Sequence, residues 1–199
     1  MEKQKKPFVV SCGILKDEMQ ELIKTGQLDV DMRYLGTGLH YNYEHLKNAL
    51  DSALQDASGN QRGKGIVIYG DVCMGFDQQI KDLVNKHGFV KVDALNCIDC
   101  LLGGKGELLK LDPNHRAFFL TPGWIRFWER LERSKEDLRN RYSMLDGLMI
   151  LDSLGNLDEL KDKIEEISRH TGLQVIKRKE VGLEGLRHVV EEAIRRLSP

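Results

Sequence analysis

The residues best suited to chemistry in this sequence are four cysteines, because each stands just after a short apolar segment. They are Cys12, Cys73, Cys97 and Cys100. Thiolates that come together from several segments are the ligands that zinc and iron–sulfur clusters take in proteins. The spacing has one CxxC pair and two single cysteines, so it matches neither a zinc ribbon nor a ferredoxin run. Sulfur ligation alone therefore leaves zinc and an iron–sulfur cluster both open.

The segments before the cysteines have the composition of buried strands, and amphipathic segments alternate with them along the chain. The expected strands cover residues 8–11, 30–35, 65–69, 91–95, 117–120, 147–151 and 173–177. The expected helices cover residues 15–24, 43–56, 77–87, 124–141, 156–170 and 183–197, and the polar stretch 57–64 is an expected loop. This alternation predicts an α/β fold with a doubly wound, mostly parallel sheet and helices on both faces. With no repeat or clear linker, we expect residues 1–199 to form a single α/β domain.

In such a sheet the loops after the strands gather at one edge, where ligands bind. Three separate segments are therefore expected to bring four thiols to the same edge. Each cysteine also precedes an expected helix start, and a helix N-terminus favours thiolate over thiol. The neighbouring residues predicted to contact a cofactor are Gly13, Asp71 and Gly75, with Asp71 orienting a ligand from one layer further out.

The cysteines also have plainer interpretations. Free cysteine is a small apolar residue that is often buried, so each of the four is equally a candidate packing residue. Cys97 and Cys100 together have the spacing of a redox dithiol, although the glycines at 103–106 end the following helix early. His40, in the Gly-rich turn after the second expected strand, is either a further metal ligand or a surface residue.

Composition excludes several classes of protein. The 30 basic and 31 acidic residues give a net charge of -1, which argues against a nucleic-acid binder. No apolar run approaches the ~20 residues that cross a bilayer, and no signal peptide is recognisable. Gly103-Gly104-Lys105-Gly106 lacks the rest of a P-loop, so binding of a nucleoside triphosphate is not supported. We therefore expect a cytoplasmic protein with reduced thiols and no membrane span.

The motifs around the cysteines resemble those of the family called domain of unknown function 1638. They are Ser11-Cys12-Gly13, Tyr69-Gly70 leading to Cys73 and Gly75, Cys97-Ile98 leading to Gly103, and Leu120-Thr121-Pro122-Gly123-Trp124. The similarity runs from about Phe8 to the last helix. Members of this family look like proteins of bacteria and methanogenic archaea, many anaerobic, sometimes encoded beside corrinoid methyltransferases. The resemblance implies a setting in anaerobic one-carbon or corrinoid-linked methyl metabolism and supplies no mechanism.

The family's three typical cysteines fall on Cys12, Cys73 and Cys97. Where the family often shows His-Asp, this chain has Leu95-Asn96, so a site that uses imidazole there is in doubt. The additional Cys100 is a candidate fourth ligand in its place. All-sulfur ligation and an anaerobic setting together favour an iron–sulfur cluster over zinc.

The partner implied by the resemblance is a small-molecule substrate or a corrinoid methyltransferase, and a bound corrinoid has no motif of its own here. The alternative function is a non-catalytic accessory protein that binds a corrinoid or a methyltransferase, with thiols that only pack. The sequence leaves open whether the chain is an enzyme and whether it forms a homo-oligomer.

Overall fold

The computed structural model describes residues 6–59, 65–75, 78–130 and 135–197, and its strands form two parallel sheets. The first sheet has the order β2-β1-β3-β4 and the second the order β5-β6-β7. All strand pairs in both sheets are parallel. The strands are β1 (Phe8–Cys12), β2 (Asp31–Leu35), β3 (Gly65–Ile68), β4 (Val90–Lys91), β5 (Ala117–Leu120), β6 (Gly147–Asp152) and β7 (Val175–Glu180).

Helices follow most of the strands, as parallel pairing requires. The α-helices are α1 (Lys16–Lys24), α2 (Tyr43–Gly59), α3 (Gln79–Lys86), α4 (Cys97–Leu102), α5 (Glu107–Leu111), α6 (Pro122–Trp128), α7 (Lys135–Tyr142), α8 (Lys161–Thr171) and α9 (Glu184–Leu197). Three short 3-10 helices are η1 (Gly13–Leu15), η2 (Thr37–Tyr41) and η3 (Leu157–Leu160).

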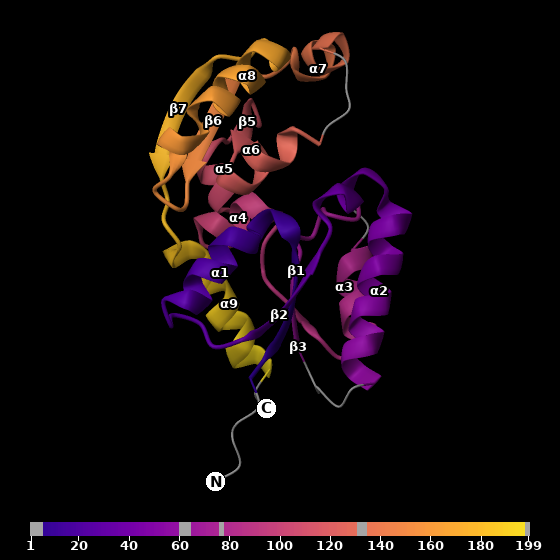
Figure 1. The fold of residues 1–199 in the computed structure, drawn as a ribbon. Helices are drawn as coiled ribbons and strands as arrows, with labels where there is room; N and C mark the ends of the chain where they lie inside the picture. Colours follow the sequence, from indigo (N-terminus) through magenta and orange to yellow (C-terminus); the bar gives the residue numbers. More distant parts are fainter. Residues whose placement is uncertain (1–5, 60–64, 76–77, 131–134, 198–199) are drawn as a thin grey trace.

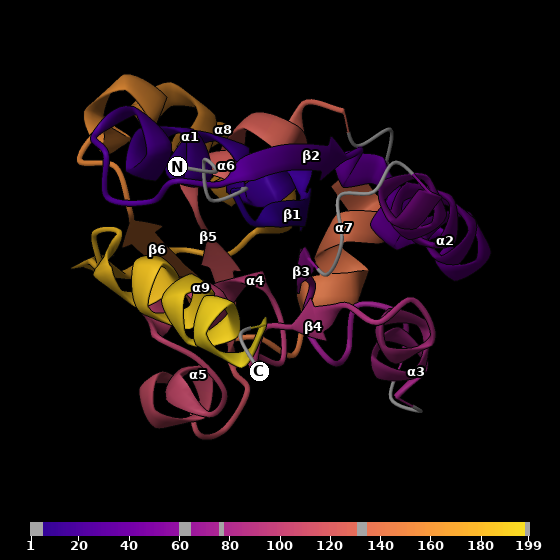
Figure 2. The same cartoon turned by 90° about the horizontal axis from the view of Figure 1, so that it is seen from below.

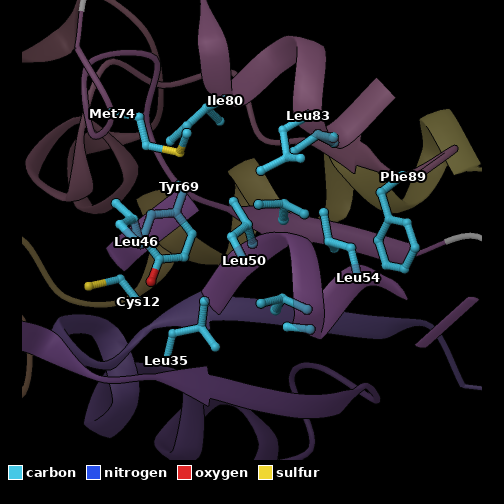
Figure 3. Packing of buried hydrophobic residues seen from close by; sticks show 14 of the residues in the cluster. Cys12, Leu35, Leu46, Leu50, Leu54, Tyr69, Met74, Ile80, Leu83 and Phe89 are labelled. Carbon is cyan, nitrogen blue, oxygen red and sulfur yellow. The ribbon is translucent and has the colours of Figure 1, made fainter. Parts of the chain in front are cut away.

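The first sheet is covered on both faces because successive side chains of its central strands point in opposite directions. Val10 and Val67 face α2 and α3, whereas Val9 and Ile66 face α1 and α9. Figure 3 shows the first of these faces, where leucines of α2 and apolar residues of α3 meet around Tyr69. Because both faces are covered, these strands are apolar throughout instead of alternating with polar residues.

The second sheet is likewise covered on both faces. Leu148 and Ile150 of β6 pack in one cluster with apolar residues of α6, α7 and α8. Met149 and Leu151 of the same strand pack on the other face, against residues of α4 and α5. This sheet lies above the first in Figure 1, and the last helix, α9, returns from it to the first sheet. There α9 packs against β3, β4 and α4.

The carboxyl ends of the two sheets face each other. The start of α6, which follows β5, packs against η1, which follows β1. Ser153, which follows β6, donates a hydrogen bond of 2.8 Å to Glu18 of α1. The loops that follow the strands of both sheets therefore meet in the middle of the molecule (Figures 1 and 2).

The α/β fold and its parallel pairing are confirmed, and most elements lie within a few residues of their expected positions. The expected single sheet is instead two sheets. The helix expected over residues 124–141 is two helices, α6 and α7, and residues 131–134 lie outside the described residues, as do Asp77 and the expected loop's residues 60–64. The helix α4 is the short helix that ends at the glycines after Cys100, whereas α5 was not expected. Both are too short for a hydrophobic period to mark them.

Candidate functional site

The first sheet brings the three cysteine segments to one edge. β1 is central and pairs in register with β2 and β3, so Cys12 and the residues after Ile68 lie at the same edge. The segment after β3 then runs beside the segment after β4, because the amides of Asp71 and Val72 donate to the carbonyls of Ala94 and Leu95. Gly70 allows this close approach, since a Cβ there would lie 2.1 Å from the Leu95 oxygen. The convergence expected from the sequence therefore has a structural cause.

Cys12 ends β1 and is buried in the face that packs against α2 and α3. Its thiol accepts from the Ile14 amide at 3.5 Å, so it caps η1. Figure 3 shows Cys12 and Tyr69 side by side, with Met74 beyond the ring.

Cys97 and Cys100 lie one turn apart on α4, which Asn96 caps by accepting from the amides of Ile98 and Asp99. Cys97 packs against core clusters on both faces of the first sheet, and Cys73 against the cluster that contains Cys12. Cys100 is fully buried in the cluster on the other face, with residues of α1 and α9. The four thiols thus surround the carboxyl edge of the sheet instead of lying on one face of it.

Burial controls the protonation of these thiols. It raises the pKa of Cys12 from an ordinary value of 9.0 to about 12 and that of Cys73 to about 11. Burial also raises the pKa of Cys97 and of Cys100 well above the ordinary value. The expectation that helix N-termini favour thiolates here is therefore wrong, because desolvation outweighs the helix dipole.

The thiols also act on one another. A charge on Cys73 raises the pKa of Cys12, and charges on Cys12 and Cys73 raise that of Cys97. Charges on Cys73 and Cys12 likewise raise the pKa of Cys100. Across the described residues, no three or more histidine, cysteine, aspartate or glutamate side chains are already arranged to hold a metal ion. Burial and the mutual repulsion of their charges therefore favour the neutral form of all four thiols.

The other predicted contact residues have distinct positions. Gly13 starts η1, where a Cβ would lie 2.9 Å from the Leu35 carbonyl oxygen, so this position needs glycine. Gly75 has a φ of +104° in the turn that follows Cys73. The carboxylate of Asp71 pairs with Lys91 and Lys105 and lines a separate cavity. The side chain of His40 lies outside the described residues, so its ligand role stays a prediction.

The segment Thr121–Trp124 from the second sheet reaches the thiols. Thr121 caps α6 by accepting from the Trp124 amide, and Pro122 occupies the first turn. The indole Nε1 of Trp124 donates to the Cys97 sulfur at 3.4 Å. No local pattern in the sequence predicts this contact, which joins residues that follow strands of the two sheets.

The sequence model of a family described as Protein of unknown function (DUF1638) matches residues 34–190. The chain belongs to this family. Cys73, Cys97, Cys100 and the Thr121–Trp124 segment lie inside the matched DUF1638 region, and Cys12 lies before it. No curated protein and no solved structure matches the chain. None of the described helices has both the length and the apolar character needed to cross a bilayer.

A second feature of this DUF1638 chain is a cavity of about 890 Å³ between α1 and the loops that follow β6 and β7. Glu18 lies beside it, fully buried, with its pKa raised by burial and Ser153 as its hydroxyl partner. Glu18 stands at i+3 from Leu15 and i−4 from Leu22, on the buried side of the helix. That spacing is a signal by which the sequence could have revealed a buried carboxyl group.

Proposed function

We propose that this chain is a cytoplasmic α/β protein that binds an iron–sulfur cluster or zinc through Cys12, Cys73 and Cys97, with Cys100 as a further ligand. The observation that supports it is geometric: pairing of β1 with β3, and the hydrogen bonds between the segments after β3 and β4, bring the three cysteine segments to one edge of the first sheet. Soft divalent metals and iron–sulfur clusters are the partners that such a donor set favours.

Metal binding at this position would change the protonation of the thiols. Each thiolate opposes the formation of the next, and burial opposes all of them. A metal ion bound among them would have to offset both effects, and its binding would release protons. A bound metal with three of these ligands would keep one position for a substrate atom and act on it as a Lewis acid.

Metal loading would require local rearrangement, because no three of these side chains are already arranged as ligands among the described residues. Coupling of metal binding to local folding is common in small metal sites. The indole of Trp124 contacts Cys97, so this tryptophan would report the change. A Trp128→Phe background leaves Trp124 as the one tryptophan of the chain.

An iron–sulfur cluster is favoured over zinc by the all-sulfur donor set and by the anaerobic setting that the family resemblance implies. That resemblance is also the sole support for a role in one-carbon or corrinoid-linked methyl metabolism. The competing function is a non-catalytic protein that binds a corrinoid or a methyltransferase. The apolar surroundings of Cys12 and Cys100 favour it, because buried thiols often serve packing alone.

The test is metal and sulfide analysis of protein purified under strict exclusion of oxygen. We expect about one cluster or one zinc per chain, with absorption near ~400 nm if a cluster is present. Cys12→Ser, Cys73→Ser and Cys97→Ser should each abolish metal loading, whereas Cys100→Ser should only weaken it. Emission of Trp124 in the Trp128→Phe background should fall on loading.

Leu54→Val is the matched control, because Leu54 belongs to the same core cluster as Cys12 and carries no thiol. It should lower stability and leave loading unchanged. Fewer than ~0.2 metal ions per chain in protein with four free thiols would overturn the proposal, because thiolate sites bind their metals tightly. The accessory-protein function would then be the better account.

A further inference from the structure

A second cavity, of about 720 Å³, lies beside the edge strand β4 of the first sheet and is distinct from the thiol group. Residues of α3, the segment 89–95, Lys105 and the end of α9 line it. Its volume falls in the range of small-molecule sites. The charged side chains on its wall are Lys81, Lys91, Lys105, Arg196, Asp71 and Asp93.

These side chains make the cavity cationic in a chain whose net charge is -1. Four cations face two carboxylates, which leaves two positive charges in excess. Clefts lined by one sign of charge concentrate ions of the opposite sign. The local imbalance therefore favours an anion of about two negative charges.

One carboxylate holds two of the ammonium groups. Asp71 accepts from Lys91 at 2.7 Å and from Lys105 at 2.8 Å, through its two different oxygens. Lys91 is 10% exposed and also contacts the carbonyls of Val92 and Ala94. Lys91 thus fixes Asp71, and Asp71 in turn holds the half-exposed Lys105 at the cavity. Because one carboxylate is shared, it does not neutralise both ammonium groups.

Neither of the other two cations forms an ion pair within the described part of the chain, and the Glu192 carboxylate acts on Arg196 only at longer range. Arg196 donates to the backbone oxygens of Lys91 and Glu192, and Lys81 makes no ion pair there. A guanidinium group binds phosphate oxygens through parallel hydrogen bonds, and a lysine supplies a compact charge. Two lining cations, Lys81 of α3 and Arg196 of α9, thus remain for a ligand.

The glycines beside Lys105 do not form a phosphate-binding loop. The amides of Gly104 and Gly106 point at the buried residue Asp99, and the Lys105 amide donates to the Asp93 carbonyl. The carboxylate of Asp99 also accepts from the amides of Leu95 and Leu108. Any anion in the cavity must therefore be held by side chains, which agrees with the absence of a P-loop pattern.

We propose that this cavity binds a phosphorylated small molecule, with its phosphate group held by Arg196, Lys105 and Lys81. A phosphate monoester carries about two negative charges at neutral pH, which matches the excess of positive charge. The remaining volume, beside Phe89 and Asn85, accommodates the organic part of the ligand. None of the four cysteines lines this cavity, although Asp71 lies two residues before Cys73.

The experiment is titration calorimetry of the intact protein with inorganic phosphate and with pyrophosphate, at constant ionic strength. We expect one site per chain, with pyrophosphate bound more tightly because it carries more charge. Arg196→Gln and Lys105→Gln should each weaken pyrophosphate binding about 10-fold, the loss expected when one charge-assisted hydrogen bond is removed. Malonate, a dicarboxylate, should bind more weakly than pyrophosphate.

Lys47→Gln is the matched control, because Lys47 is an exposed lysine of α2 outside the cavity. It should leave the affinity unchanged. If Lys47→Gln weakened pyrophosphate binding equally, the overall charge of the protein and not the cavity would govern binding. That result would overturn the proposed site. Absence of binding up to 10 mM, an order-of-magnitude limit for a specific site, would also overturn it. The lysines would then only protect the edge strand from pairing with other chains.

Discussion

Glu18 lies on α1 with its side chain fully buried, and one of its oxygens accepts from Ser153 of the other sheet. Its second oxygen meets no hydrogen-bond partner among the described residues. Burial raises the pKa of this carboxyl group above its ordinary value of 4.5, with the Ser153 hydrogen bond acting in the opposite direction. A carboxyl group with a raised pKa favours the folded state below the unfolded pKa. That advantage is lost as the pH rises through the folded pKa.

We therefore expect Glu18→Gln to be more stable than the natural chain at pH 7.5, by a few degrees in Tm. Removal of a buried charge is the reason, and the difference should shrink as the pH falls to about 4.5. Thermal unfolding at several pH values measures it. Glu44→Gln, at an exposed position of α2, should give no such trend. A constant difference at all pH values would contradict the role assigned to burial.

At the scale of elements, two close backbone approaches hold the candidate site together. Gly70 lets the segment after β3 run beside the segment after β4, and Gly123 lets α6 meet η1. A Cβ at position 123 would lie 2.0 Å from the Ile14 carbonyl oxygen. Backbone cannot move aside as a flexible side chain can, so this contact between the two sheets requires glycine.

Gly123→Ala should therefore lower stability by about 1–3 kcal/mol, the usual cost of forcing extra atoms into packed structure. It should also change Trp124 emission, because the neighbouring indole loses its position against Cys97. Gly38→Ala is the control, since a Cβ at position 38 meets no atom within 4 Å. Denaturant unfolding followed by fluorescence makes the measurement, and equal effects of the two variants would contradict the role of the close approach.

At the scale of the molecule, packing of the first sheet depends on the last helix of the chain, α9. α9 comes after all strands of the second sheet, yet its Leu186 and Val190 are buried in the first. One face of the first sheet is therefore not fully covered until the whole chain is present. Ser153 with Glu18 and Trp124 with Cys97 add polar contacts between the two halves. These connections are the reason to expect one cooperative unit, in line with the prediction of a single domain.

A matched pair of variants tests this expectation. Leu186→Ala removes packing from the first sheet, and Leu160→Ala removes it from the second. Each should cost about 2–5 kcal/mol. In calorimetry, both should shift one common unfolding transition to lower temperature. Two transitions, each moved by only one of the variants, would show that the halves unfold separately.

The α/β class, the parallel pairing and the positions of most strands and helices could be predicted from the amino-acid sequence alone. Apolar runs such as 65–69 and the helical period of 43–56 are local properties, so they can be read without knowing what they pack against. The arrival of three cysteine segments at one sheet edge followed from the same alternation. Cys12, at the carboxyl end of a central strand, is the clearest example of this prediction.

The division of the strands into two sheets and the surroundings of each thiol become visible only in the folded chain. Strand neighbours depend on contacts between distant residues, and no local period records that β5 begins a second sheet. Burial likewise depends on what other segments cover, which is why Cys97 has a raised pKa despite starting a helix. The Trp124 contact and the shared carboxylate of Asp71 join residues far apart in the chain, and spatial proximity of that kind exists only once the chain has folded.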